Sequence, residues 1–307
     1  MSAPAWMDLG LRVRSDPPRR AERRLLQGWW RETELGVPPG RDERGVLRNN
    51  MLPVSAVQSD PGLNFLDPAV CTYAQRRAPT VIGLDGTLDE DRLFRNLLSS
   101  MPMCFNLFGM FRAYPEAAGR VLSGVTGLPI DQVESIEVEW IPQGRHPLGD
   151  RTAFDALVVY RDREGRRGFL GVETKYTESF SRKVYDKDRY REVTAWPEAG
   201  FVAGAAQRLM AVDTNQLWRN SLLAVAVRAQ MEFDFGAVWV VALEDDPHVQ
   251  TALAVFEDLH SAPDQLVRAT SIERLVAAAQ TEPVFTRWAG DFSRRYLDIS
   301  AVCPGSE

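Results

Sequence analysis

The stretch FLGVETKYTE, residues 169–178, begins as an apolar run typical of a buried strand and then places Glu173 and Lys175 one residue apart. Because side chains alternate along a strand, these two charges lie on the same face. Charged side chains are almost never fully buried unless they are paired or used in chemistry. The stretch therefore predicts either a strand that ends at a solvated edge or a functional site at its end.

A second apolar, β-rich run lies just upstream. The stretches RTAFDALVVYRD (151–162) and GFLGVETKY (168–176) are joined by the turn-like REGRR, which favours an antiparallel hairpin. With the turn centred near residue 164, Asp155 lies opposite Glu173 and on the face of Glu173 and Lys175. The hairpin therefore predicts two carboxylates and one ammonium at the open end of two apolar strands.

Two neighbouring carboxylates repel each other unless a positive charge lies between them. Mg²⁺ takes oxygen ligands and commonly binds through one or two carboxylates together with substrate phosphate. We therefore expect Asp155 and Glu173 to bind Mg²⁺, with Mn²⁺ able to substitute, and the backbone carbonyl of Thr174 to offer a further ligand. A metal held in this way promotes phosphodiester hydrolysis, and Lys175 would polarise the attacking water.

The alternative interpretation is a salt bridge at a strand end, with Asp155 merely beginning its strand. An exposed pair of that kind would contribute little stability and would not require charges on runs this apolar. Composition also singles out Lys175, because lysine occurs only at 175, 183 and 187 among 36 basic residues. Arg and Lys differ most where a compact ammonium must lie close to another group, so the functional interpretation is favoured.

Composition and motifs exclude several other classes of protein. The 307 residues are 45% hydrophobic with a net charge of −6, which argues against non-specific coating of nucleic acid but not against an enzyme with a focused cleft. Three isolated cysteines indicate a reducing compartment. No signal-peptide run, membrane-length apolar stretch, phosphate loop, dinucleotide fingerprint, nucleophile elbow or histidine metal pair is present. We expect a cytoplasmic protein without ATP or membrane partners.

The order of elements indicates an α/β fold. ESIEVEWI (134–141) alternates like a strand, the hairpin follows, and then come a long apolar helix over 213–231 and a buried strand over 235–246. Helical patterns flank this β, β, β, α, β core on both sides. We predict a mostly helical N-terminal portion, residues 1–130, packed on a core with C-terminal helices, residues 131–307, as one compact domain.

Asp155 followed by Glu173-x-Lys175 across a hairpin resembles the PD-(D/E)XK nuclease superfamily. The stretches SSMPMCFNLFG, RTAFDALVVY, GVETKYTE and QLWRNSLLA are similar to a bacterial branch of restriction-endonuclease-like proteins, over about residues 95–245. The resemblance implies a restriction-endonuclease-like core with a mixed four-stranded sheet flanked by helices, Mg²⁺ dependence and a DNA substrate. Phe154 stands where the proline of the motif's name would be, but that proline is not a ligand.

Two further positions are candidates for the site. Glu139, on the strand before the hairpin, is either an additional carboxylate or a solvated residue of an alternating strand. Gln216 opens the long helix, with Asn220 one turn later on the same face. The resemblance suggests a polar helix residue over the metal site; the alternative is a helix start with its polar end in water.

The run SRKVYDKDRYRE (181–192) directly follows the Glu-x-Lys strand. Basic residues interleaved with tyrosines suit a phosphate backbone, and acidic residues in the same run leave a solvated helix face as the alternative. The candidate nucleic-acid-binding residues are Arg182, Lys183, Lys187 and Arg189.

These inferences predict a Mg²⁺-dependent endodeoxyribonuclease, a hydrolase of phosphodiester bonds that serves restriction, phage defence or repair. One alternative is a non-catalytic DNA-binding or assembly protein that retains the nuclease fold. Another is an RNA nuclease, which would share the chemistry. DNA is the expected partner, and a homodimer remains open.

Overall fold

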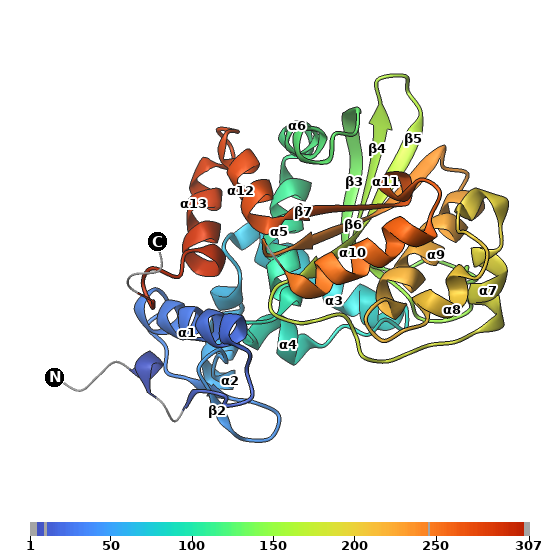
Figure 1. The fold of residues 1–307 in the computed structure, drawn as a ribbon. Helices are drawn as coiled ribbons and strands as arrows, with labels where there is room; N and C mark the ends of the chain where they lie inside the picture. The colour runs from blue at the N-terminus through green and yellow to red at the C-terminus, as the bar shows by residue number, and fades with distance from the viewer. Residues whose placement is uncertain (1–4, 9–10, 245, 304–307) are drawn as a thin grey trace.

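A mixed five-stranded sheet forms the centre of the computed structural model, which describes residues 5–8, 11–244 and 246–303 (Figure 1). The strand order is β3-β4-β5-β6-β7, with antiparallel pairing among the first three strands and parallel pairing among the last three. The strands are β3 (Ile130–Trp140), β4 (Phe154–Asp162), β5 (Arg167–Lys175), β6 (Phe235–Ala242) and β7 (Val267–Ser271). The predicted four strands are therefore corrected to five, because β7 extends the sheet beyond β6.

Helices account for most of the remaining structure. Before the large sheet lie η1 (Ala5–Met7), α1 (Pro18–Thr33), α2 (Val54–Ser59), η3 (Pro61–Asn64), α3 (Pro68–Gly83), α4 (Glu90–Arg95), α5 (Ser100–Ala113) and α6 (Pro115–Thr126), with the short strands β1 (Gly40–Arg41) and β2 (Leu47–Arg48). Between β5 and β6 lie α7 (Asp188–Thr194), η4 (Pro197–Ala199), α8 (Ala205–Leu209) and α9 (Asn215–Gln230). After β6 come α10 (Pro247–Leu259), α11 (Pro263–Leu266), α12 (Ile272–Gln280), α13 (Thr286–Phe292) and the π-helical turn η5 (Ser293–Leu297).

Each face of the sheet carries its own apolar cluster. Val158 and Val172 belong to the cluster beneath α3, α5, α6, α12 and α13, whereas Val159 and Phe169 belong to the cluster beneath α7, α9 and α10. Strands covered on both faces read as continuous apolar runs, which is why the sequence of β4 and β5 looks buried throughout.

The predicted hairpin between β4 and β5 is confirmed, including its register. Ala156 pairs with Val172, and Leu157 pairs with Gly171. At the turn, the Asp162 carboxylate accepts hydrogen bonds from the backbone of the turn and from the Arg166 side chain at 2.8 Å. A fixed turn sets the register, so the open end of the hairpin is also fixed.

The strands β3 and β4 reverse their faces near the open end of the sheet. Val138 and Ala156 are paired and lie in one apolar cluster, but Trp140 and Phe154, two residues further along each strand, are paired in the other. Regular alternation would keep residues two apart on one face. Glu139, between Val138 and Trp140, has a φ of 51°, a left-handed conformation that is rare outside glycine. The reversal therefore occurs at Glu139 and at the residue that precedes Ala156.

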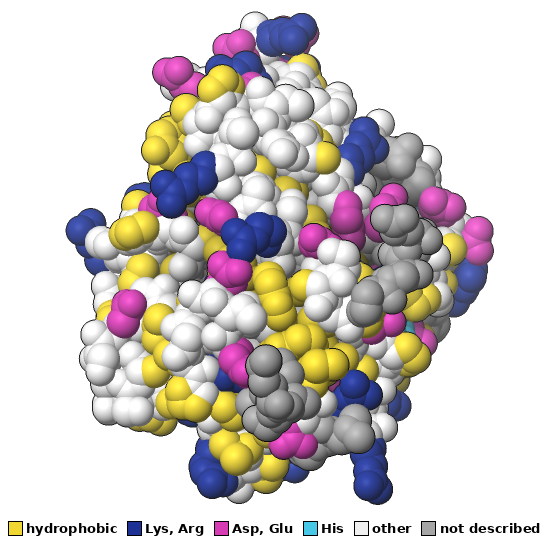
Figure 2. Space-filling view, turned by 90° about the vertical axis from the view of Figure 1, so that its left-hand side faces the viewer, with side chains coloured by type: hydrophobic (Ala, Val, Ile, Leu, Met, Phe, Trp, Pro, Cys, Tyr) yellow, Lys and Arg dark blue, Asp and Glu magenta, His cyan; other side chains and the backbone are white. Residues whose placement is uncertain are grey.

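The N-terminal and C-terminal helices meet beside this end of the sheet (Figure 1). The Gln27 side chain in α1 donates to the Arg295 carbonyl in η5 at 2.7 Å and to the Tyr176 hydroxyl at 3.3 Å, directly after β5. Figure 2 shows this side of the molecule, with basic and acidic side chains interspersed. Within the described ranges, no helix is long and apolar enough to cross a membrane.

Candidate active site

The open end of the hairpin brings the predicted carboxylates and lysine together. Asp155 is the second residue of β4, and Glu173 and Lys175 lie at the end of β5 beside it. Glu173 and Lys175 are buried, with only 2% and 8% of their surface exposed. The Lys175 Nζ lies 2.6 Å from the Glu173 Oε1. The charges on these apolar strands are therefore paired and buried rather than solvated.

Asp155 is fixed against the neighbouring strand. Its Oδ2 accepts hydrogen bonds from the Thr174 backbone N–H at 2.7 Å and from the Thr174 hydroxyl at 2.8 Å. Its backbone carbonyl accepts a bond from the Cys104 thiol of α5 at 3.4 Å. Both ends of the residue are held, which leaves Asp155 Oδ1 as the oxygen without a hydrogen bond to the described residues.

Glu173 is held from above by the first two turns of α9. Its Oε1 accepts from the Gln216 side chain and its Oε2 from the Asn220 side chain, each at 2.6 Å. The Gln216 Oε1 in turn accepts from the Ser181 backbone at 2.7 Å and from Lys175 at 3.3 Å. The structure thus places Gln216 over the site, where the resemblance suggested a polar helix residue, and its role stays a prediction. Asn220 belongs to the same face through its i+4 spacing.

Lys175 carries a charge in this setting. Burial favours the neutral amine, but the Glu173 and Asp155 carboxylates raise the pKa of Lys175 above its ordinary value. Its ammonium also lies 5.2 Å from the centre of the Phe180 ring. The residue is therefore an ammonium at neutral pH, suited to hold and polarise a water or to stabilise developing negative charge, and not to accept a proton.

A third carboxylate, Glu139, faces the same centre from β3. Burial and then the Asp155 charge raise the pKa of Glu139 to about 8. Burial and then the Glu173 charge raise the pKa of Asp155 to about 7. Lys175 alone does not neutralise three neighbouring carboxylates, and a cation at this point would relieve their repulsion.

Two side chains of α3 hold the strand that carries Glu139. The Arg77 Nε donates to the Val138 carbonyl at 2.8 Å, and its Nη2 donates to the Glu139 carbonyl at 2.9 Å. The Tyr73 hydroxyl accepts from the Val138 N–H at 2.9 Å. These contacts stabilise the unusual backbone at Glu139. Sequence reasoning missed them, since nothing in the local pattern reveals which side chain of a distant helix reaches a strand edge.

The residues fit a divalent metal held by few protein ligands. Among the described residues, no group of three or more His, Cys, Asp and Glu side chains has the geometry of a metal cluster. Asp155 and Glu173 instead offer a pair of oxygen donors, and Mg²⁺ is usually bound in this way, with its other positions filled by water and substrate. Glu173 would exchange part of its contact with Lys175 or Gln216 for the metal.

The predicted basic residues do not form one cluster. Arg182 and Lys183 are exposed on the loop after β5. Lys187 donates to the Gly149 carbonyl at 3.0 Å, and Arg189 donates to the Pro147 carbonyl at 3.1 Å, so these two lie against the loop between β3 and β4. Their role in binding nucleic acid stays a prediction.

Comparison with known proteins identifies the family of the chain. A family model described as the PD-(D/E)XK nuclease superfamily matches residues 14–298. Searches of the curated proteins and of the solved structures found no match. The family match runs from the helices before the large sheet to the last helical turn and includes the whole candidate site. Because the match spans most of the chain, this protein belongs to the PD-(D/E)XK nuclease superfamily.

Proposed function

We propose that the protein is a metal-dependent endonuclease that hydrolyses phosphodiester bonds in DNA. The observation that carries the proposal is the cluster of half-buried Asp155 with buried Glu173 and Lys175 beneath Gln216. Membership of a nuclease superfamily supports the reaction class. The superfamily resemblance also favours DNA as the substrate and restriction, phage defence or repair as the setting.

Each side chain of the site would have its own role in the reaction. Asp155 and Glu173 would hold Mg²⁺, with Mn²⁺ as a substitute and with Glu139 and the Thr174 carbonyl as further candidate ligands. When bound, the metal supplies positive charge that stabilises the phosphate and lowers the pKa of water. The Lys175 ammonium would orient the attacking water and stabilise charge in the transition state. Gln216 and Asn220 hold the Glu173 carboxylate in position.

The first experiment tests the substrate. Purified protein is incubated with circular plasmid, linear duplex, single-stranded DNA and RNA, each with Mg²⁺, Mn²⁺ or chelator. Metal-dependent cutting of circular DNA supports a DNA endonuclease. Cutting confined to RNA would instead support the RNA nuclease. Metal-independent binding without cutting of any substrate would favour the non-catalytic alternative.

A further inference from the structure

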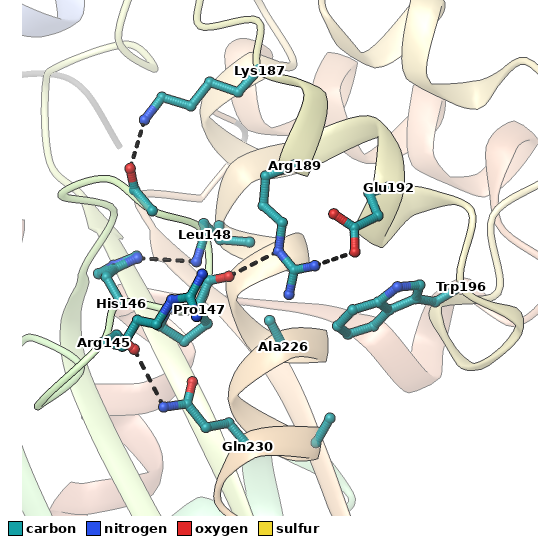
Figure 3. Close-up of a pocket in the computed structure, with 12 residues that line it drawn as sticks. Arg145, His146, Pro147, Leu148, Lys187, Arg189, Glu192, Trp196, Ala226 and Gln230 are labelled. Atoms are coloured by element: carbon teal, nitrogen blue, oxygen red, sulfur yellow. Dashed lines mark hydrogen bonds and ion pairs between the residues drawn. The ribbon is translucent and has the colours of Figure 1, made fainter.

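A pocket with a volume of 860 Å³ lies at the far end of α9 from the candidate active site (Figure 3). One wall is the loop after β3, with Arg145, His146 and Pro147, and the opposite wall is α7 with Trp196 after it. Ala226, Ala229 and Gln230 of α9 form the floor. Ligand pockets commonly measure about 300–1,000 Å³, so this one is large enough for a nucleotide.

The lining combines positive charge with a flat aromatic surface. Lys187, Arg189 and Arg145 contribute basic groups, and the acidic lining residue Glu192 is paired with Arg189. Arg145 is exposed, and none of the described residues forms an ion pair with its side chain. The Arg189 guanidinium lies 4.9 Å from the centre of the Trp196 ring, and such a pair offers the planar and cationic surfaces on which bases stack.

The loop between β5 and α7 connects this pocket with the candidate active site. At the catalytic end, the Ser181 N–H donates to Gln216, and at the pocket end Lys187 donates to Gly149. Exposed Arg182 and Lys183 lie between these anchors. From Gln216 to the floor residues of α9 the distance along the helix is about 15–20 Å. That length corresponds to about four to six nucleotides along one strand of a duplex.

We propose that this pocket binds one nucleotide of the substrate strand, several residues away from the bond that is cut. Arg145 and Lys187 contact its phosphate, and its base lies on the Trp196–Arg189 surface above the two floor alanines. The inference rests on the proposed function and extends it, because an unpaired base must leave the helical stack to enter the pocket. The substrate strand is therefore single-stranded or locally opened at this position.

The test measures binding in chelator, where no cleavage occurs. Labelled single strands of 6 to 20 nucleotides are titrated against wild type at fixed salt. Affinity should rise in one step of about tenfold at the strand length that first reaches the pocket. A step of this size is expected when one stacked base and its phosphate are added to the contact. Two variants should remove the step. Arg145→Glu reverses a charge, whereas Ala229→Trp fills the pocket from an exposed floor position and leaves every charge in place.

Arg163→Glu is the matched control, because Arg163 is equally exposed but lies in the hairpin turn at the far end of the strands. It should retain the step, and melting curves check the fold of all three variants. If only Arg145→Glu loses the step, the pocket contributes positive charge to strand binding but no base enters it, and base insertion is overturned. Retention of the step in both pocket variants would also overturn the inference.

A free nucleotide has the same chemistry as a nucleotide of the strand, so a nucleoside monophosphate is titrated as well. Binding that Ala229→Trp abolishes, without competition against the 20-nucleotide strand, would assign the pocket to free nucleotides and overturn its place on the substrate path. Cleavage of the same strand with Mg²⁺ is scored separately. Cleavage without a length step contradicts only the pocket, whereas absence of both binding and cleavage contradicts the proposed function too.

Discussion

The two ends of the β4–β5 hairpin place the same residue type in opposite settings. At the turn, burial opposes ionisation of Asp162, but hydrogen bonds from Arg166 and the turn backbone hold its pKa below the ordinary value. At the open end, burial and the Glu173 charge raise the pKa of Asp155 to about 7. The turn carboxylate is fully satisfied and fixes the register. The open-end carboxylate retains unrelieved repulsion, which is the pattern expected where a protein reserves a place for a cation.

The largest effect is expected from Lys175. Because it supplies a positioned charge, Lys175→Ala should lower cleavage by about two decades or more, the scale lost when one charge-stabilising donor leaves a site. Lys175→Arg should also be poor, since a broad guanidinium cannot replace a compact ammonium in a buried position. Initial cleavage rates with saturating Mg²⁺ measure both. Metal and DNA binding should persist in Lys175→Ala because the carboxylates remain.

The same variants distinguish catalysis from a structural salt bridge. If Lys175 only stabilised the fold, Lys175→Arg would be nearly silent and Lys175→Ala would lower the melting temperature without a specific loss of activity. Full cleavage by Lys175→Ala would end the catalytic assignment.

Metal binding should distinguish variants at the open end of the hairpin from a variant at its turn. Mn²⁺ should raise the melting temperature of wild type, because a ligand that binds only the folded state stabilises it. Asp155→Asn combined with Glu173→Gln should lose this increase and the heat of Mn²⁺ binding in calorimetry. Asp162→Asn should lower the starting melting temperature but keep the Mn²⁺ increase. Equal heats from wild type and the double variant would disprove the metal site.

Opposite pKa shifts predict opposite dependence of stability on pH. Asp155 has a raised pKa, so its contribution to stability is complete at acid pH and is lost as pH rises through about 7. Asp162 has a lowered pKa, so its contribution is present at neutral pH and is lost as pH falls below its ordinary range. In chelator, Asp155→Asn should therefore flatten the decline in melting temperature between about pH 4, where the carboxyl ionises in the unfolded chain, and about pH 7, where it ionises in the folded protein. Asp162→Asn should flatten the acid side instead. An unchanged decline in Asp155→Asn would refute the assigned shift.

The sequence could predict much of this site because its main residues lie on one hairpin. Strand alternation puts Glu173 and Lys175 on one face, and a short turn fixes the register that brings Asp155 to the same end of the hairpin, so the spacing predicted that these three residues lie together. Helical spacing placed Gln216 and Asn220 on one face, but the position of Gln216 over the site was suggested by the family resemblance and its role stays a prediction. Glu139 remained ambiguous because its position depends on a left-handed backbone that the alternating pattern conceals.

Other features required contacts between distant segments. The strand β7 lies in a tail that we expected to be helical. Its five residues are too few to show a clear strand alternation, and the sequences on both sides of it have helical patterns. The helix α4 begins at Glu90 with Asp89 as its cap. The next helix includes Pro102 in its first turn, where the missing N–H has no helical partner. The local sequence is compatible with more than one starting residue for each of these helices, and tertiary packing determines which one is used.

A smaller effect is expected from Arg77, which holds the backbone at Glu139. Arg77→Ala removes the hydrogen bonds to two backbone carbonyls, and leaving buried groups unpaired costs about 1–3 kcal/mol of stability. The Glu139 carboxylate should then move, so cleavage should fall by several-fold and Mn²⁺ binding should weaken. Arg76→Ala is the control, since Arg76 is the exposed neighbour on the same helix. A drop in melting temperature with unchanged Mn²⁺ affinity would show that Arg77 acts only on the fold.

The smallest effect concerns single charges beyond each end of the hairpin. Lys183 follows the open end, whereas Arg163 lies in the turn, and both are exposed. If DNA passes over the open end, Lys183→Ala should reduce the slope of log affinity against log salt by about 1, as for one phosphate contact. Arg163→Ala should leave that slope unchanged, although the change in net charge is identical. Anisotropy titrations at several salt concentrations measure the slopes. Equal changes in both variants would mean that the overall charge of the protein, and not a DNA path at the open end, sets the salt dependence.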